Sequence, residues 1–121
     1  MDKHSLGQFG EEQAARYLRR RFYSILERNY RCRFGEIDLI AKRGGVLAFV
    51  EVKLRRDDSH GEAREFVTAL KQQRVIAAAQ HWLGLHETEL QPRFDVIEVY
   101  APEGTNTLLP EINHLENAFS V

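Results

Sequence analysis

Two apolar runs in the first half of the chain carry ionisable side chains whose types could do chemistry. Asp38 lies in the first run, residues 35–41, and Glu51 and Lys53 lie in the second, residues 46–53. Mg²⁺ prefers hard oxygen ligands, and proteins often hold it with one or two carboxylates, waters and substrate phosphate. Two carboxylates and an amine on adjacent strands are therefore suited to hold a divalent cation, Mg²⁺ or Mn²⁺, beside a phosphodiester.

Each group has a distinct chemical use in such a site. Asp38 and Glu51 supply carboxylate ligands, and the main-chain carbonyl of Val52 is a third donor. A metal in this position lowers the pKa of a bound water and neutralises charge on a phosphodiester. Lys53 is suited to orient or deprotonate the attacking water, or to stabilise the developing charge. The alternative is a strand with Glu51 and Lys53 on its solvent face, because a Glu-x-Lys pattern alone is a weak signal.

The two runs are predicted to form a β-hairpin. Val, Ile, Leu and Phe dominate both runs, and Gly44-Gly45 between them supplies the positive φ angles of a tight turn. Because alternate side chains of a strand share a face, Glu36 and Asp38 are expected on one face of the first strand. Ile37 and Leu39 are expected on the other face.

A helix is predicted before the hairpin, beginning with a capping box at Ser5 and Gln8 and ending near Arg21 or Phe22. Its inward stripe is predicted to consist of Ala14, Leu18 and Phe22, with Ala15 at the edge. Glu11 falls on the same stripe. A carboxylate there needs a partner or a changed charge state, which makes Glu11 a candidate metal ligand. The spacing is equally compatible with Glu11 at the edge, reaching water or an arginine.

A second helix is predicted from an N-cap at Thr68 to about Leu83. Lys71 lies one turn before Val75 on its inward line and is a candidate accessory residue; the alternative is a lysine that reaches solvent at the helix end. An exposed loop is expected over residues 54–62.

Strands are expected over residues 23–30 and 93–100. The predicted order is helix, three strands, helix, strand. A hairpin cannot make parallel neighbours, so an α/β fold with a mixed central sheet follows, with the second helix as its crossover. We expect one domain over residues 1–100 and an irregular tail, 101–121, that docks on the core or on a partner.

Composition is that of a globular chain: 121 residues, 43% hydrophobic and 29% charged, with Cys32 as the single cysteine. No run approaches the ~20 apolar residues that span a membrane, and the N-terminus lacks a signal-peptide pattern, so a cytoplasmic protein without a membrane partner is expected. Residues 1–56 carry a net charge of +6 and residues 57–121 carry −7. The basic half favours a polyanionic partner such as nucleic acid.

The arrangement of these motifs resembles the PD-(D/E)XK nuclease superfamily, in the restriction-endonuclease-like and Holliday-junction-resolvase-like group. More closely, the chain is similar to the bacterial YraN-like family of uncharacterised, endonuclease-like proteins. The resemblance covers nearly the whole chain, although Ile37 stands where the superfamily usually has proline. The matching segments are Gly10-Glu11, Arg28-Asn29, Gly35–Ile40, Phe49–Lys53 with Arg55, Lys71, Arg93–Val96 and Asn117–Phe119.

The resemblance implies a metal-dependent endonuclease acting on DNA. Glu11, Asp38 and Glu51 would surround the metal, Lys53 would be catalytic, and Lys71, with Gln72 less strongly indicated, would be accessory. Junction resolvases of the superfamily are similarly small and dimeric, so branched DNA and a homodimer are implied. Two alternatives remain open from sequence: a non-catalytic nucleic-acid-binding or assembly module that retains the fold, and an interaction protein without a nucleic-acid partner.

Overall fold

The computed structural model describes residues 3–56 and 67–120. The elements, in chain order, are α1 (Lys3–Arg20), β1 (Ser24–Cys32), β2 (Gly35–Arg43), β3 (Val46–Arg55), α2 (Ala69–Leu85), β4 (Gln91–Tyr100), the 3₁₀ turn η2 (Gly104–Asn106) and β5 (Glu111–Phe119). No helix in the described ranges is long and apolar enough to cross a membrane.

The sheet is mixed and its strands follow the chain order, β1-β2-β3-β4-β5. β1, β2 and β3 are successively antiparallel, β3 and β4 are parallel, and β5 is antiparallel to β4. α2 is the crossover between the two parallel strands. The predicted fold class and the order of the first six elements are confirmed. Residues 111–119, expected as part of an irregular tail, instead form a fifth strand that extends the sheet beyond β4.

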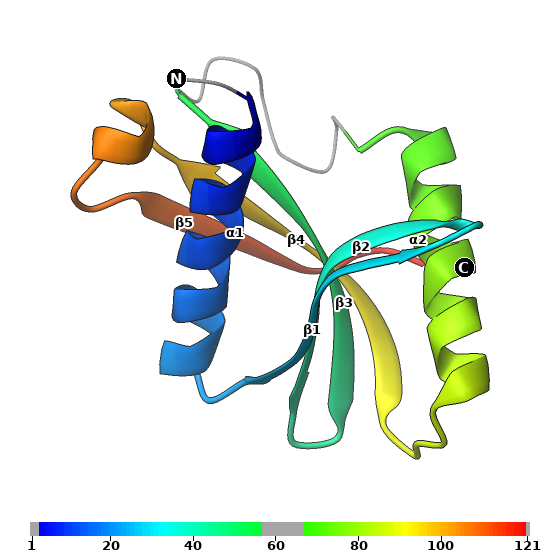
Figure 1. The fold of residues 1–121 in the computed structure, drawn as a ribbon. Coiled ribbons are helices and arrows are strands. Elements are labelled where there is room, and N and C mark those ends of the chain that lie inside the picture. Colours follow the sequence, from blue (N-terminus) through cyan, green and yellow to red (C-terminus); the bar gives the residue numbers. More distant parts are fainter. Residues whose placement is uncertain (1–2, 57–66, 121) are drawn as a thin grey trace.

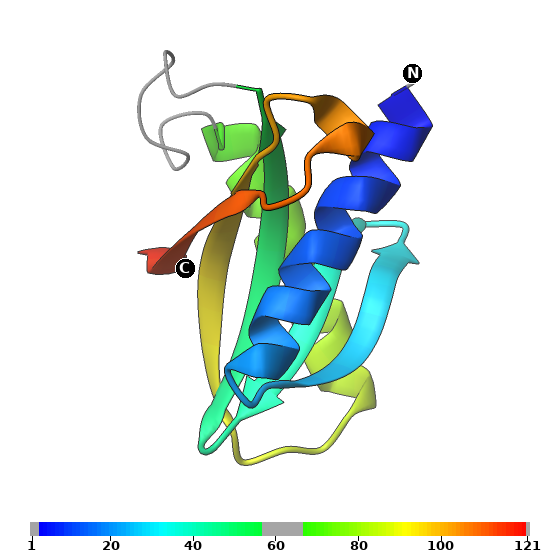
Figure 2. The same ribbon diagram turned by 90° about the vertical axis from the view of Figure 1, so that its left-hand side faces the viewer.

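The two helices cover opposite faces of the sheet (Figure 1). α1 packs on Leu39, Val50 and Ile97, whereas α2 packs on Phe49 and Val96. Figure 2 shows α1 running along the strands of its face, close to β1 and β3. The strands thus present one set of alternating side chains to each helix, as a sheet buried on both faces requires.

The inward stripe of α1 is confirmed for Ala14, Ala15 and Leu18, which are fully buried. The prediction for Phe22 is wrong, since this side chain is 87% exposed. α1 ends at Arg20, and Phe22 adopts a left-handed conformation with φ 70°. The chain therefore leaves the helical register, and Tyr23 occupies the core position, its N–H donating to the carbonyl of Leu18 at 2.9 Å.

The two predicted helix starts have different outcomes. Ser5 is not an N-cap, because α1 already begins at Lys3 and Ser5 lies within it. Thr68 does cap α2: its hydroxyl accepts a hydrogen bond from the N–H of Lys71 at 3.1 Å. The predicted loop over 54–62 begins later than expected, since β3 extends to Arg55, and residues 57–62 lie outside the described ranges.

β2 and β3 pair along only part of their length. Their register runs from Arg43 opposite Val46 to Leu39 opposite Val50 and ends there. β2 stays paired with β1 as far as Gly35, while β3 stays paired with β4 as far as Arg55. The hairpin strands therefore separate at Asp38 and Glu51.

The separation also breaks the predicted alternation in β2. Leu39 packs under α1, as alternation requires, but Ile37 packs in the cluster under α2. The expectation that these two residues share a face is wrong. Between Gly35 and Leu39, β2 pairs with β1 and no longer with β3, so its faces are not those of the β2–β3 hairpin.

Candidate metal site where β2 and β3 separate

Asp38 joins the two strands at the point where their main-chain pairing stops. Its Oδ2 accepts a hydrogen bond from the N–H of Val52 at 2.8 Å. If the pairing of β2 with β3 continued, a main-chain carbonyl of β2 would accept this N–H. The carboxylate of Asp38 accepts it instead. This contact fixes Asp38 beside Glu51, the residue that precedes Val52 in β3.

Glu51 is the buried member of the pair, with 5% of its surface exposed. Its Oε1 lies 3.6 Å from the Nζ of Lys71, and its Oε2 is buried with no hydrogen-bond partner within residues 3–56 and 67–120. Burial and the nearby charge of Asp38 raise the pKa of Glu51 to about 7, against the opposing charges of Lys71 and Lys53. Close to neutral pH this carboxyl is therefore poised between its neutral and anionic forms.

The pKa of Asp38 is raised as well, first by burial. The N–H of Val52 and the charge of Lys71 oppose that shift. The two carboxyl groups are close enough to share a proton, an arrangement that favours the neutral form of Glu51 and the anionic form of Asp38. They therefore titrate as a coupled pair.

α1 brings Glu11 to the same place, on the stripe predicted from sequence. Its Oε1 is buried and has no hydrogen-bond partner in the described part of the chain. Burial and the charge of Asp38 raise the pKa of Glu11, while a hydrogen bond from the Asn29 side chain and the charges of Arg28 and Arg31 oppose the shift. Proximity to Asp38 favours the site interpretation of Glu11, although arginines are within electrostatic reach, as the alternative required.

Asn29 is a contributor that sequence reasoning missed. It lies in β1 with φ 53°, a left-handed conformation that asparagine tolerates better than most residues. An asparagine inside a strand pattern was the available signal. The left-handed conformation thus occurs at the residue whose side chain bonds Glu11.

Lys71 reaches the site from the first turn of α2. Its Nζ lies 3.6 Å from Glu36 Oε1 and 3.6 Å from Glu51 Oε1. Lys71 thus links two carboxylates and does not merely extend into solvent. Gln72 is engaged elsewhere, because its side-chain amide donates to the carbonyl of Val67 at 2.9 Å and supports the start of the helix.

Lys53 lies two residues beyond Glu51 in β3 and is partly buried. The positive charge of Lys53 lowers the pKa of Glu51 and so opposes the rise that burial causes. In the parallel register Lys53 stands opposite Glu98 of β4. The structure therefore places Asp38, Glu51, Lys53 and Lys71 in one neighbourhood.

Glu98 is a second residue that sequence reasoning missed. It is fully buried and accepts hydrogen bonds from Arg55 and from the hydroxyl of Tyr100. The signal in the sequence was an acidic residue inside the apolar run Val96–Tyr100, the same signal that singled out Glu51. The partners of Glu98 supply a proton donor for each oxygen, so it forms a satisfied group next to Lys53.

The donor set fits a hard divalent cation in chemical type. The described residues contain no ready-made group of three His, Cys, Asp or Glu side chains around a metal position. They contain the adjacent pair Asp38–Glu51, with buried, unpartnered oxygens on Glu51 and Glu11. Carboxylate oxygens of this kind are what Mg²⁺ and Mn²⁺ select, with water or substrate completing the coordination shell.

The fold and site thus define a small α/β protein with paired acidic residues where two strands of a mixed sheet separate. The family model described as "Uncharacterised protein family UPF0102" matches residues 10–99. The chain belongs to this family.

Its relatives are of nearly the same length. It is similar to a UPF0102 protein of Geotalea daltonii, 41% identical over 99% of this chain and 93% of the relative. It is similar to one of Caldanaerobacter subterraneus subsp. tengcongensis, 43% identical over 98% of each chain. A third, from Syntrophotalea carbinolica, is 47% identical over 97% of this chain and 93% of the relative.

Proposed function

We propose that this protein is a metal-dependent endonuclease that hydrolyses phosphodiester bonds of DNA. The observation that carries the proposal is the Oε2 atom of Glu51. This atom is buried and has no hydrogen-bond partner among the residues that the structure describes; it belongs to a carboxyl whose pKa is about 7 and which lies beside Asp38. An unpartnered buried carboxylate oxygen is unfavourable for folding, and a bound cation would compensate it.

Asp38, Glu51 and Glu11 would hold Mg²⁺ or Mn²⁺, with the carbonyl of Val52 as a further donor. When bound, the cation would neutralise phosphate charge and lower the pKa of a coordinated water. Asp38 is held in position by the N–H of Val52. Lys53 would orient the attacking water or stabilise negative charge on the phosphate. Lys71, between Glu36 and Glu51, would keep the acidic pair ionised and in place.

The resemblance to the PD-(D/E)XK superfamily supports the same assignment. The order of helices and strands agrees with that superfamily, and so do the positions of four charged residues: Glu11, Asp38, Glu51 and Lys53. A fold alone does not establish an activity, so the weight rests on the site. Branched DNA as the substrate, a homodimer as the working form and the cytoplasm as the location belong to the same proposal.

Cleavage of linear, flapped and four-way DNA with Mg²⁺ or Mn²⁺ tests the activity. Wild type should cut at least one of these substrates, and chelation should stop it. Lys53→Ala should lower the rate by roughly 10²–10⁴-fold, the range for loss of an acid–base or charge-stabilising group. Lys42→Ala is the matched control, since Lys42 is an exposed lysine on β2, away from the separated ends. Equal cutting by wild type and Glu51→Gln would show that another enzyme is responsible.

One contact favours a second function, a non-catalytic nucleic-acid-binding or assembly module. Lys71 already places an ammonium group near Glu51, so the acidic site has a cation of its own. This function predicts salt-dependent DNA binding without cutting. It also predicts no heat of Mn²⁺ binding in calorimetry. A Mn²⁺ binding heat that disappears in Glu51→Gln would exclude it.

A further inference from the structure

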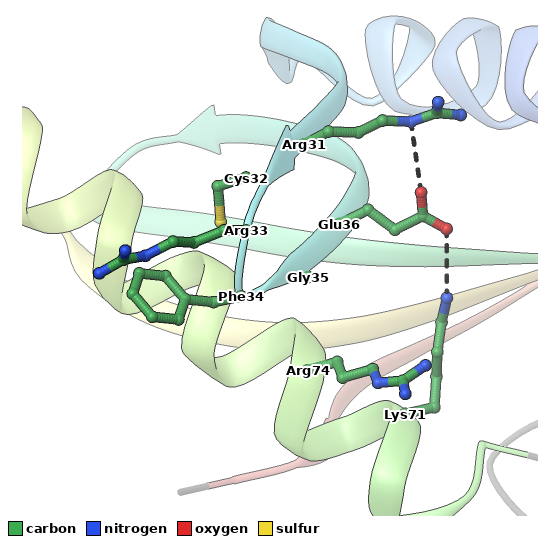
Figure 3. Close-up of a pocket in the computed structure, with 8 residues that line it drawn as sticks. All are labelled: Arg31, Cys32, Arg33, Phe34, Gly35, Glu36, Lys71 and Arg74. Atoms are coloured by element: carbon green, nitrogen blue, oxygen red, sulfur yellow. Dashed lines mark ion pairs between the residues drawn. The ribbon is translucent and has the colours of Figure 1, made fainter.

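A second feature lies beside the acidic site. The turn between β1 and β2 and the first turns of α2 enclose a pocket of about 380 Å³. Figure 3 shows the side chains that line it. The ones that matter here are Arg31, Arg33, Phe34, Glu36, Lys71 and Arg74.

The pocket has an excess of positive charge. Arg31 lies 3.3 Å from Glu36 and Lys71 lies 3.6 Å from it, so one carboxylate is shared by two cations. Within residues 3–56 and 67–120, Arg33 and Arg74 form no ion pair with a carboxylate. Four cations against one anion favour an anionic occupant.

Phe34 adds an aromatic surface to these charges. Its side chain is 46% exposed at the tip of the turn. The guanidinium of Arg33 lies 4.8 Å from the centre of its ring, and the ring of His81 lies 5.7 Å away on α2. Aromatic side chains next to arginines are typical of surfaces on which unpaired bases stack.

The turn is fixed against the helix by Gly35. A Cβ atom at this position would lie 2.4 Å from the carbonyl oxygen of Arg74. Only glycine permits so close an approach of the β1–β2 turn to α2. The pocket is therefore preformed by main-chain packing, and its charged side chains project from rigid elements.

The pocket and the acidic site share Lys71. This side chain lines the pocket and contacts Glu51 at 3.6 Å. A strand bound with one phosphate at Asp38 and Glu51 would therefore pass the pocket with an adjoining nucleotide.

We propose that this pocket binds an unpaired nucleotide of the DNA substrate, with Phe34 stacking on its base and Arg33 and Arg74 contacting its phosphates. The inference deepens the proposed nuclease function and rests on it for the placement of the neighbouring phosphate. It assigns the substrate class as DNA with a single-stranded segment beside the phosphate at Asp38 and Glu51.

Binding without cleavage tests the stacking role. Fluorescence anisotropy in EDTA would compare a labelled single-stranded oligonucleotide with a duplex of the same sequence. Phe34→Ala should weaken single-strand binding about tenfold and leave duplex binding unchanged, because base stacking on an aromatic ring is lost. Phe34→Tyr should retain binding, and Phe34→Leu, which keeps an apolar side chain at the turn, should match Phe34→Ala. Phe22→Ala is the control, since Phe22 is 87% exposed at the end of α1.

Salt dependence tests the phosphate contacts. Arg33→Ala and Arg74→Ala should each lower the slope of log K against log salt by about 0.7 for a single strand, the contribution of one phosphate. Arg20→Ala, the same change of charge at an exposed site on α1, should leave the slope unchanged.

Three results would overturn the proposal: equal losses in Phe34→Ala and Phe22→Ala, an equal loss for duplex, or an equal loss for heparin, which has no bases. Because nothing is cut in EDTA, these results stand whether or not the protein is a nuclease. A protein that binds as expected but never cleaves with Mn²⁺ would refute only the proposed function.

Discussion

Asp95 on β4 and Glu51 on β3 are buried carboxylates at nearly the same height of one sheet, since Asp95 stands opposite Val50 in the parallel register. They lie on opposite faces of the sheet, and they differ in how many hydrogen-bond partners surround them. Asp95 receives two hydrogen bonds from Arg93, one from His114 and one from the N–H of Asn117, at 2.8–3.0 Å. Among the described residues, Glu51 has one ion pair at 3.6 Å and an oxygen without a hydrogen-bond partner.

The pKa values follow these surroundings. Burial alone would raise the pKa of Asp95, but the bonds from His114, Arg93 and Asn117 hold it below its usual value. Burial and a neighbouring anion raise that of Glu51 to about 7. A fully bonded carboxylate is suited to hold elements together, whereas an incompletely bonded one is suited to bind a cation or proton.

The contacts of Asp95 support the structural role. Arg93 also donates to the hydroxyl of Tyr23 at 2.7 Å, and His114 bonds the hydroxyl of Tyr17 at 3.1 Å. The group thereby joins β4 to β5, to the C-terminal part of α1 and to the segment between α1 and β1. This network explains why charged residues occur in the buried strand β4.

The largest effect that sharpens the comparison is expected from Asp95→Asn. The change leaves Arg93 and His114 without their buried anion and should lower the free energy of unfolding by about 3–5 kcal/mol. Asp38→Asn, the same substitution in the acidic site, should leave stability unchanged or higher at pH 7 without divalent ions. Urea unfolding measures both. Equal losses would show that the two carboxylates are structurally equivalent.

The next effect concerns pH. The pKa of Glu51 is raised from 4.5 to about 7, so the folded state retains a proton that the unfolded chain releases. The protonated Glu51 carboxyl therefore contributes to the free energy of unfolding. This stabilising contribution is fully present below pH 4.5 and is lost as pH rises to about 7. The loss is on the order of 3 kcal/mol in metal-free buffer.

Glu51→Gln should remove this loss of stability between pH 4.5 and 7. Urea midpoints measured from pH 4 to pH 8 would show it. The control Glu103→Gln, at an exposed position, should leave the pH dependence unchanged. An unchanged slope in Glu51→Gln would mean that the carboxyl is already ionised at acid pH. Asp95 acts in the opposite sense, because its pKa is lowered. Its contribution is present above its unfolded pKa and is lost as pH falls through the folded value.

The smallest effect is expected from Tyr17→Phe. Removing this hydroxyl deletes one neutral hydrogen bond to His114 and should lower stability by about 1 kcal/mol. A double-mutant cycle with His114→Gln would isolate the pair. If the two changes in unfolding free energy simply added, Tyr17 and His114 would not be coupled. The Tyr17–His114 bond would then not belong to the Asp95 network.

Local pattern in the sequence predicted much of the fold and singled out residues that lie close together where β2 and β3 separate. Two apolar runs with Gly44-Gly45 between them predicted the hairpin, and helical spacing placed Glu11 and Lys71 on inward faces. The N-cap at Thr68 followed from residue type alone. These predictions succeeded because each depends on a few neighbouring residues whose side-chain directions are set by the local period.

β5 could not be predicted in this way. Asn117 has φ 53°, and the register against β4 shifts between Phe94 and Val96. Both irregularities break the period-2 pattern by which strands are recognised. His114 and Asn117 consequently gave no sign that they bond Asp95.

The sequence by itself placed Glu51, Asp95 and Glu98 within apolar runs, where a buried carboxylate needs hydrogen-bond or charge partners. Only the tertiary structure decided which of them would be satisfied. Asp95 obtains two of its four hydrogen bonds from β5, whereas β2 separates from β3 at Asp38 and leaves Glu51 with an oxygen that no described residue bonds. The physical reason is that hydrogen-bond partners distant in sequence are set by strand register, which no local pattern encodes.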